Sequence, residues 1–134
     1  MDKVKLENDL RTLAEKKTSL SVLDYHLPEY DTLEEELHEL EDALQSEFGD
    51  FLEEAISKVH DIYCPDADML IPIAYMAGKY IITEEGMDVE FHQGVPFEVE
   101  DNPDQKSSIV LVPAPTRILL LVDENKKEEV WKLE

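Results

Sequence analysis

Apolar residues recur every three or four positions through the first half of the chain, which is the period of an α-helix with one buried face. Residues 2–17 carry four such positions: Leu6, Leu10, Leu13 and Ala14. A second series continues to residue 62: Leu33, Leu37, Leu40, Leu44, Phe48, Phe51, Ala55, Val59 and Ile62. The pattern predicts a short helix and then a long one, and Pro28 favours an extended connection between them.

Two features bear on the bounds of the long helix. Thr32 and Glu35 have the spacing of a capping box, in which the hydroxyl and the carboxylate each bind a free backbone N–H, so we expect the helix to begin at Thr32. Gly49 costs about 1 kcal/mol inside a helix relative to alanine. Because Asp50 and Glu53 repeat the capping pattern, both one continuous helix and two helices divided at Gly49 fit the sequence.

The segment after the long helix allows two interpretations. Cys64 and Pro65 interrupt the helical period, and either Asp66 or Asp68 is suited to cap a third, short helix that ends near residue 78. A buried strand over residues 69–75 is the competing interpretation. We favour the helix, because Pro72 is tolerated in a first helical turn.

The last part of the chain reads as β-structure. Glycines in the pairs 85–86 and 93–94 are typical of tight hairpin turns, and residues 101–108 read as a polar loop. The expected strands are residues 79–83, 87–91, 95–100, 109–112, 117–122 and 128–133. The runs 109–112 and 117–122 are continuously apolar, which indicates central strands covered on both faces.

These elements predict one α+β domain over residues 1–134, mainly helical in 1–78 and mainly β in 79–134. Two or three N-terminal helices would pack on a C-terminal antiparallel meander of five or six strands. The meander either curls into a small, partly open barrel or lies against the helices.

Negative charge is concentrated in the middle of this chain. The net charge is −21, and residues 18–57 contain thirteen acidic residues and no lysine or arginine. Exposed helices usually mix the two signs, because an opposite pair four residues apart gains about 0.2 to 0.5 kcal/mol and a like pair loses a similar amount. We therefore predict an acidic interaction face on the long helix, formed by Glu34, Glu35, Glu39, Asp42, Glu53 and Glu54.

This charge favours a basic protein as the partner and disfavours direct binding to nucleic acid or to an anionic membrane. The leading hypothesis is a non-enzymatic interaction module, such as an inhibitor, an immunity protein or a nucleic-acid mimic. Tyr25, Tyr30 and Trp131 are candidate interface aromatics, although a tryptophan on an amphipathic strand more often faces the core.

Two other hypotheses remain open. One is a small ligand-binding or metal-dependent enzymatic domain with its site between the helices and the sheet, where His60 and Cys64 have the four-residue spacing of two zinc ligands on one helical face. The ligand set is incomplete, so we expect no metal, and no motif indicates a cofactor or a catalytic nucleophile. The other is homodimerisation through the leucine stripe.

The sequence also suggests a compartment. A single cysteine excludes an internal disulfide, the N-terminus lacks the apolar core of a signal peptide, and no apolar run approaches the roughly 20 residues that cross a bilayer. A cytoplasmic location is expected.

Overall fold

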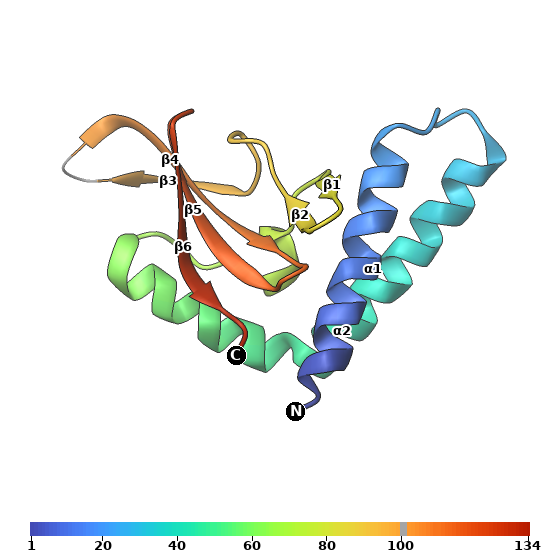
Figure 1. The fold of residues 1–134 in the computed structure, drawn as a ribbon, viewed down its shortest axis with the longest axis horizontal. Coiled ribbons are helices and arrows are strands. Elements are labelled where there is room, and N and C mark those ends of the chain that lie inside the picture. Colours follow the sequence, from blue (N-terminus) through green and yellow to red (C-terminus); the bar gives the residue numbers. More distant parts are fainter. Residues whose placement is uncertain (100–101) are drawn as a thin grey trace.

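The computed structural model describes residues 1–99 and 102–134, in which two long helices are followed by six antiparallel strands (Figure 1). The strands form a two-stranded and a four-stranded sheet, and in the described part of the chain neither closes into a barrel. This arrangement confirms the predicted α+β fold with N-terminal helices packed on a C-terminal sheet.

The first helix, α1, spans Lys3–Ser21. The carboxylate of Asp2 caps its start by accepting a hydrogen bond from the backbone N–H of Lys5 at 3.0 Å. The helix runs four residues further than predicted, because no glycine or proline interrupts residues 18–27. Its buried residues are the four that the periodicity indicated: Leu6, Leu10, Leu13 and Ala14.

The second helix, α2, spans Pro28–Tyr63 and begins four residues before the expected Thr32. Leu27 is extended, as expected of a residue before proline, and Pro28 occupies the first turn, where its missing N–H removes a donor that would have no helical partner. The predicted capping box is therefore wrong. Thr32 lies inside the helix, and its hydroxyl donates to the Pro28 carbonyl oxygen at 3.4 Å.

Gly49 does not divide α2, so the alternative with two helices is wrong. A Cβ atom at this buried position would lie 2.5 Å from the Gln45 side-chain nitrogen, and glycine leaves room for that side chain. Counted along its axis, the helix is about 54 Å long at 1.5 Å per residue, and it bends between its two halves (Figure 1). Its N-terminal half lies against α1, and its C-terminal half runs beneath the sheet (Figure 1).

The segment after α2 contains only a short 3₁₀ turn, η1, at Pro72–Tyr75, so neither the third helix nor the competing strand is present. The chain leaves the turn because Met76 is extended and forms a parallel bridge with Leu111 in the sheet. The Tyr80 hydroxyl donates to the Leu111 carbonyl oxygen at 2.7 Å and accepts from the Ala77 N–H at 2.9 Å. These contacts with the sheet replace the helical hydrogen bonds.

The strands follow in chain order: β1 (Ile81–Thr83), β2 (Gly86–Asp88), β3 (Val95–Val99), β4 (Asn102–Val112), β5 (Arg117–Val122) and β6 (Lys126–Lys132). β1 pairs only with β2, and the larger sheet has the order β3-β4-β5-β6. The hairpin predicted across residues 93–94 is therefore wrong. Gly94 has φ +95° and lies too close to the Ile109 carbonyl oxygen for a side chain, so the chain crosses here from one sheet to the other.

β4 is longer than the apolar run that predicted it, and residues 102–108 belong to the strand instead of a polar loop. Ser107 pairs with Phe97 of β3 and with Val122 of β5. Asp104 and Lys106 are exposed, because this end of the strand extends beyond the core. The polar composition marks a solvated end of a strand, where backbone pairing is retained.

Residues 109–112 of β4 and 118–121 of β5 are buried on both faces of the sheet, as their continuous apolar runs predicted. On one face, Trp131 of β6 meets Phe51 of α2 in an edge-to-face contact, with ring centroids 6.1 Å apart. On the other, Arg117 of β5 donates to the Met87 carbonyl oxygen, and Lys127 of β6 donates to that of Val89, each at 2.7 Å. The sheet therefore lies between α2 and the segment that contains β2.

Candidate functional site

An acidic stripe runs along the outer face of α2. At 3.6 residues per turn, seven exposed acids lie within about one third of the helix circumference, opposite the buried Leu37, Leu44 and Ala55. From Asp31 to Asp61 the stripe is roughly 45 Å long when counted along the helix axis at 1.5 Å per residue, and it follows the bend of α2 (Figure 1). Its members are Asp31, Glu35, Glu39, Asp42, Asp50, Glu53 and Asp61.

Four of the six predicted acidic residues belong to this stripe, and the other two lie on its flanks. Glu34 is half-buried, and Glu54 pairs with Lys58 of the next turn at 3.7 Å. Asp31, Asp50 and Asp61 belong to the stripe but were not among the predicted residues. Their angular positions on a helix that continues through Gly49 would have placed them on the same face as the predicted acids.

Two lysines of α1 pair with acids of α2 that lie beside the stripe. Lys5 pairs with Glu47 at 2.5 Å and Lys16 pairs with Glu36 at 3.1 Å, both across the contact between the two helices. Hydrogen bonds to Glu47 and then to Asp9 raise the pKa of Lys5. Among the described residues, no acid of the stripe forms an ion pair. The stripe therefore presents uncompensated carboxylates to solvent.

The three candidate aromatics occupy two different places. Tyr25 is exposed and Tyr30 half-buried at the turn between the helices, where their ring centroids lie 6.5 Å apart. Trp131 is half-buried against Phe51, within the contact between helix and sheet. The structure thus brings Tyr25 and Tyr30 together at the N-terminal end of the stripe and separates Trp131 from them.

His60 and Cys64 do not share a helical face, because α2 ends at Tyr63 and Cys64 follows it as the cap. His60 Nε2 lies 2.8 Å from the Tyr75 hydroxyl, which also accepts a hydrogen bond from the Leu70 N–H at 3.1 Å. Cys64 is buried, and burial raises the pKa of its thiol. In the described ranges no three histidine, cysteine or acidic residues are grouped so that they could hold a metal ion. Both residues therefore lie at the junction between α2 and η1, where His60 contacts Tyr75 and Cys64 caps the helix.

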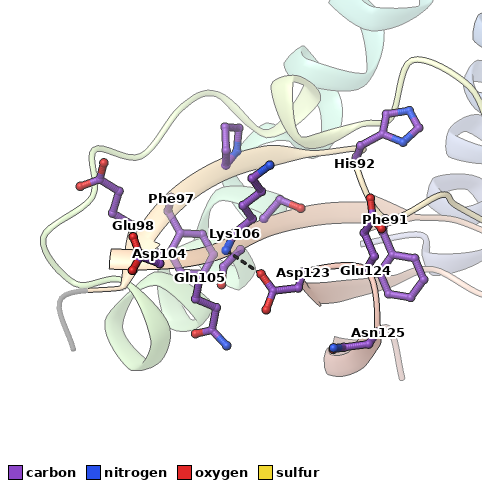
Figure 2. Close-up of a pocket in the computed structure, with 13 residues that line it drawn as sticks. Phe91, His92, Phe97, Glu98, Asp104, Gln105, Lys106, Asp123, Glu124 and Asn125 are labelled. Atoms are coloured by element: carbon purple, nitrogen blue, oxygen red, sulfur yellow. Dashed lines mark hydrogen bonds between the residues drawn. The ribbon is translucent and has the colours of Figure 1, made fainter. Parts of the chain in front are cut away.

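The structure also shows a hollow that the sequence did not indicate. The hollow is open and has a volume of about 1380 Å³. Its lining residues come from β3, β4, the turn between β5 and β6, and the segment before β3 (Figure 2). Asp123 in the turn accepts a hydrogen bond from the Lys106 N–H at 2.9 Å, which joins the turn to β4. The sequence could not reveal the hollow, because its walls depend on residues 102–108 being a strand.

The hollow combines two aromatic rings with several carboxylates. Phe91 and Phe97 contribute the apolar surface, and the acidic residues outnumber Lys106: Glu98, Asp104, Asp123 and Glu124. Its breadth leaves these carboxylates in contact with water, whereas catalytic carboxylates require a shielded environment to separate their pKa values. Among its described lining residues none comes from a helix, so it does not lie between the helices and the sheet.

No protein-family model, curated protein or solved structure matches this chain. In the residues that the structure describes, neither helix is long and apolar enough to cross a membrane.

Proposed function

We propose that this protein is a non-enzymatic interaction module whose acidic stripe binds a basic surface of another protein. One observation carries the proposal: a single continuous helix presents seven exposed acids on one face, and among the described residues none of them is paired. Occlusion of a basic nucleic-acid-binding surface, as by an inhibitor or a nucleic-acid mimic, is the form of this function that suits the charge best.

The arrangement of the cations supports this proposal. Lys5 and Lys16 pair with acids beside the stripe, at the contact between α1 and α2, and leave the outer face unneutralised. A row of like charges weakens a helix, so packing against α1 and the sheet must hold α2 in place. A field of one sign raises the association rate with an oppositely charged partner and selects against others.

Homodimerisation through the leucine stripe has less support. Of the leucines in the predicted series, Leu37 and Leu44 are buried within the chain and Leu33 and Leu40 are half-buried, which leaves little of this surface for a second copy. The net charge of −21 also opposes self-association.

The test compares two variants of equal charge. The stripe variant carries Glu35→Gln, Glu39→Gln and Asp42→Asn, and the control carries Glu84→Gln, Glu85→Gln and Asp66→Asn at exposed positions elsewhere. Each is used to capture proteins from a lysate of the native host at low and at high salt. We expect wild type and control to retain a basic protein at low salt only, and the stripe variant to lose it.

Kinetics with the captured protein then separate the stripe from total charge. The association rate should fall steeply with salt for wild type and control, and it should be lower and less salt-dependent for the stripe variant. An equal decrease of the association rate in the stripe variant and the control would mean that total charge, and not the stripe, determines binding. Binding that salt does not change would refute the proposal.

A second candidate function is the binding of a small organic cation in the hollow. The presence of two aromatic rings, Phe91 and Phe97, together with carboxylates in its lining favours such a ligand. Thermal-shift screening of aromatic and quaternary ammonium compounds tests it. A stabilising compound should lose its effect in Phe97→Ala and keep it in the stripe variant. The absence of any stabilising cation from such a panel would remove this candidate.

A further inference from the structure

An exposed apolar surface lies at the turn between α1 and α2. Val22, Tyr25 and Leu27, together called the tip, are 84%, 67% and 44% exposed. The two helices extend away from the sheet, so that this turn lies at the far end of the helical pair (Figure 1). The tip therefore contacts residues of its own turn, such as His26 and Tyr30, and keeps much of its apolar surface exposed to solvent.

The turn that carries the tip is well bonded. The Leu27 N–H donates to the Asp24 carbonyl oxygen at 3.0 Å, and the His26 N–H donates to the Asp24 carboxylate at 2.9 Å. The rings of Tyr25 and His26 lie 4.0 Å apart. Side chains held in this way lose less conformational entropy when a partner binds.

The surroundings of the tip are acidic. Asp24, Glu29 and Asp31 lie beside it, and the last turn of α1 contains no basic residue. The nearest cations along the chain are Lys16, which pairs with Glu36, and Lys17. An apolar surface bordered by acids fits a partner in which lysine or arginine flanks an aromatic or aliphatic side chain, and it repels a second copy of this chain.

We infer that the tip is the apolar anchor for a basic segment of the partner, at the end of the acidic stripe. This inference rests on the proposed function and extends it by assigning association and dissociation of the partner to two different surfaces. The stripe attracts the basic segment and sets the association rate. The tip contacts its apolar side chain and slows dissociation, because tyrosine at a desolvated contact carries a large part of the binding free energy.

Two synthetic peptides serve as probes. One is rich in lysine and contains two tryptophans, and the other replaces both tryptophans with serine at the same charge. The tip variant carries Val22→Ser, Tyr25→Ser and Leu27→Ser. Its control carries Ile81→Ser and Ile82→Ser, which replace exposed apolar residues of β1. Circular dichroism establishes that the variants are folded, and fluorescence anisotropy gives the dissociation constants.

We expect the tryptophan peptide to bind the tip variant about tenfold more weakly than wild type, in line with the loss of an interface hot spot. The serine peptide should bind both equally, and the control variant should behave as wild type. The stripe variant should bind both peptides more weakly.

Other results would overturn the inference. If the tip variant binds the tryptophan peptide as tightly as wild type does, the tip is not an anchor, while weaker binding of both peptides to the stripe variant still upholds the proposed function. If the stripe variant binds as wild type does, the proposed function itself fails. A dimer in native mass spectrometry that the tip variant loses would assign the tip to a second copy.

Discussion

The hydroxyl of Tyr80 donates a hydrogen bond to the carbonyl oxygen of Leu111 at 2.7 Å, which ties the segment after η1 to the centre of the sheet. The hydroxyl oxygen of Tyr80 also accepts a hydrogen bond from the Ala77 N–H at 2.9 Å, so the buried hydroxyl both donates and accepts within the core. Burial raises the pKa of this hydroxyl far above its ordinary value, and ionisation of Tyr80 is therefore coupled to unfolding.

Alkaline pH should destabilise the protein. Because the pKa of Tyr80 is higher in the folded state, the folded state holds its proton more tightly, and this stabilisation is lost as the pH rises above the unfolded value of about 10. The free energy of unfolding should then fall by up to about 1.4 kcal/mol per pH unit from this residue. Urea unfolding between pH 7 and pH 11 measures the slope.

Tyr80→Phe provides the comparison for this slope. The variant should lose about 1 to 3 kcal/mol at pH 7, because the Ala77 N–H and the Leu111 carbonyl are left without this partner. Its alkaline decline should be smaller than that of wild type. The rest of the decline should come from Cys64 and Tyr75, whose pKa values burial also raises, and from Lys5, whose pKa is raised by its hydrogen bonds to Glu47 and Asp9. Identical slopes in the two proteins would contradict this explanation.

Tyr75→Phe should destabilise the junction between α2 and η1. The change removes a hydroxyl that contacts His60 Nε2 at 2.8 Å and accepts from the Leu70 N–H at 3.1 Å. Loss of a buried partner costs about 1 to 3 kcal/mol, and chemical denaturation should show a decrease in this range. Tyr25→Phe at the exposed tip is the matched change and should alter stability by less than about 0.5 kcal/mol.

Gly94→Ala should be among the more damaging single substitutions in the sheet. The new Cβ would lie 2.5 Å from the Ile109 carbonyl oxygen, and φ +95° is strained for alanine. We expect a loss of more than about 1 kcal/mol in thermal or urea unfolding. Gly78→Ala is the control, because a Cβ there meets only Gln93 Oε1 at 3.8 Å, and its stability should stay close to wild type.

The stripe should weaken the helix that carries it. Glu35 and Glu39 lie four residues apart, and Asp42 lies three residues after Glu39, so their repulsion opposes helix formation. The stripe variant should therefore be more stable than wild type at low salt by a few tenths of a kcal/mol per relieved pair. High salt should reduce the difference. A stripe variant that is less stable at low salt would show that these carboxylates support the fold.

Local periodicity was the reliable signal in the helical half. Leu6, Leu10, Leu13 and Ala14 are buried as predicted, because burial of one face follows from the helical repeat alone. The start of α2 was placed too late, because the Thr32 capping pattern competed with Pro28 and both are valid start signals. Such boundaries depend on small differences in free energy between neighbouring positions.

The errors in the β half have a common physical cause. The separation of β2 and β3 into different sheets and the extent of β4 depend on tertiary contacts, which a local pattern does not encode. Gly94 resembles a hairpin glycine, yet it marks a close approach to Ile109. The polar residues of β4 resemble a loop, yet they belong to the strand, and Ser107 and Ser108 are paired on both sides by β3 and β5.

On α2, Ile62 of the predicted apolar series is exposed, and the buried Leu52 and Ile56 lie outside that series. Composition and spacing were enough to establish the α+β architecture, the core face of α1, the two central strands and the absence of cations from residues 18–57. These features follow from the types and spacing of residues that are close together in the sequence. Folding was needed to align Asp31 through Asp61 along one unbroken helix, to direct Lys5 and Lys16 away from that face, and to leave Tyr25 uncovered. These features arise from packing between distant segments, because the position of a charge in space depends on which surfaces the apolar residues have already covered.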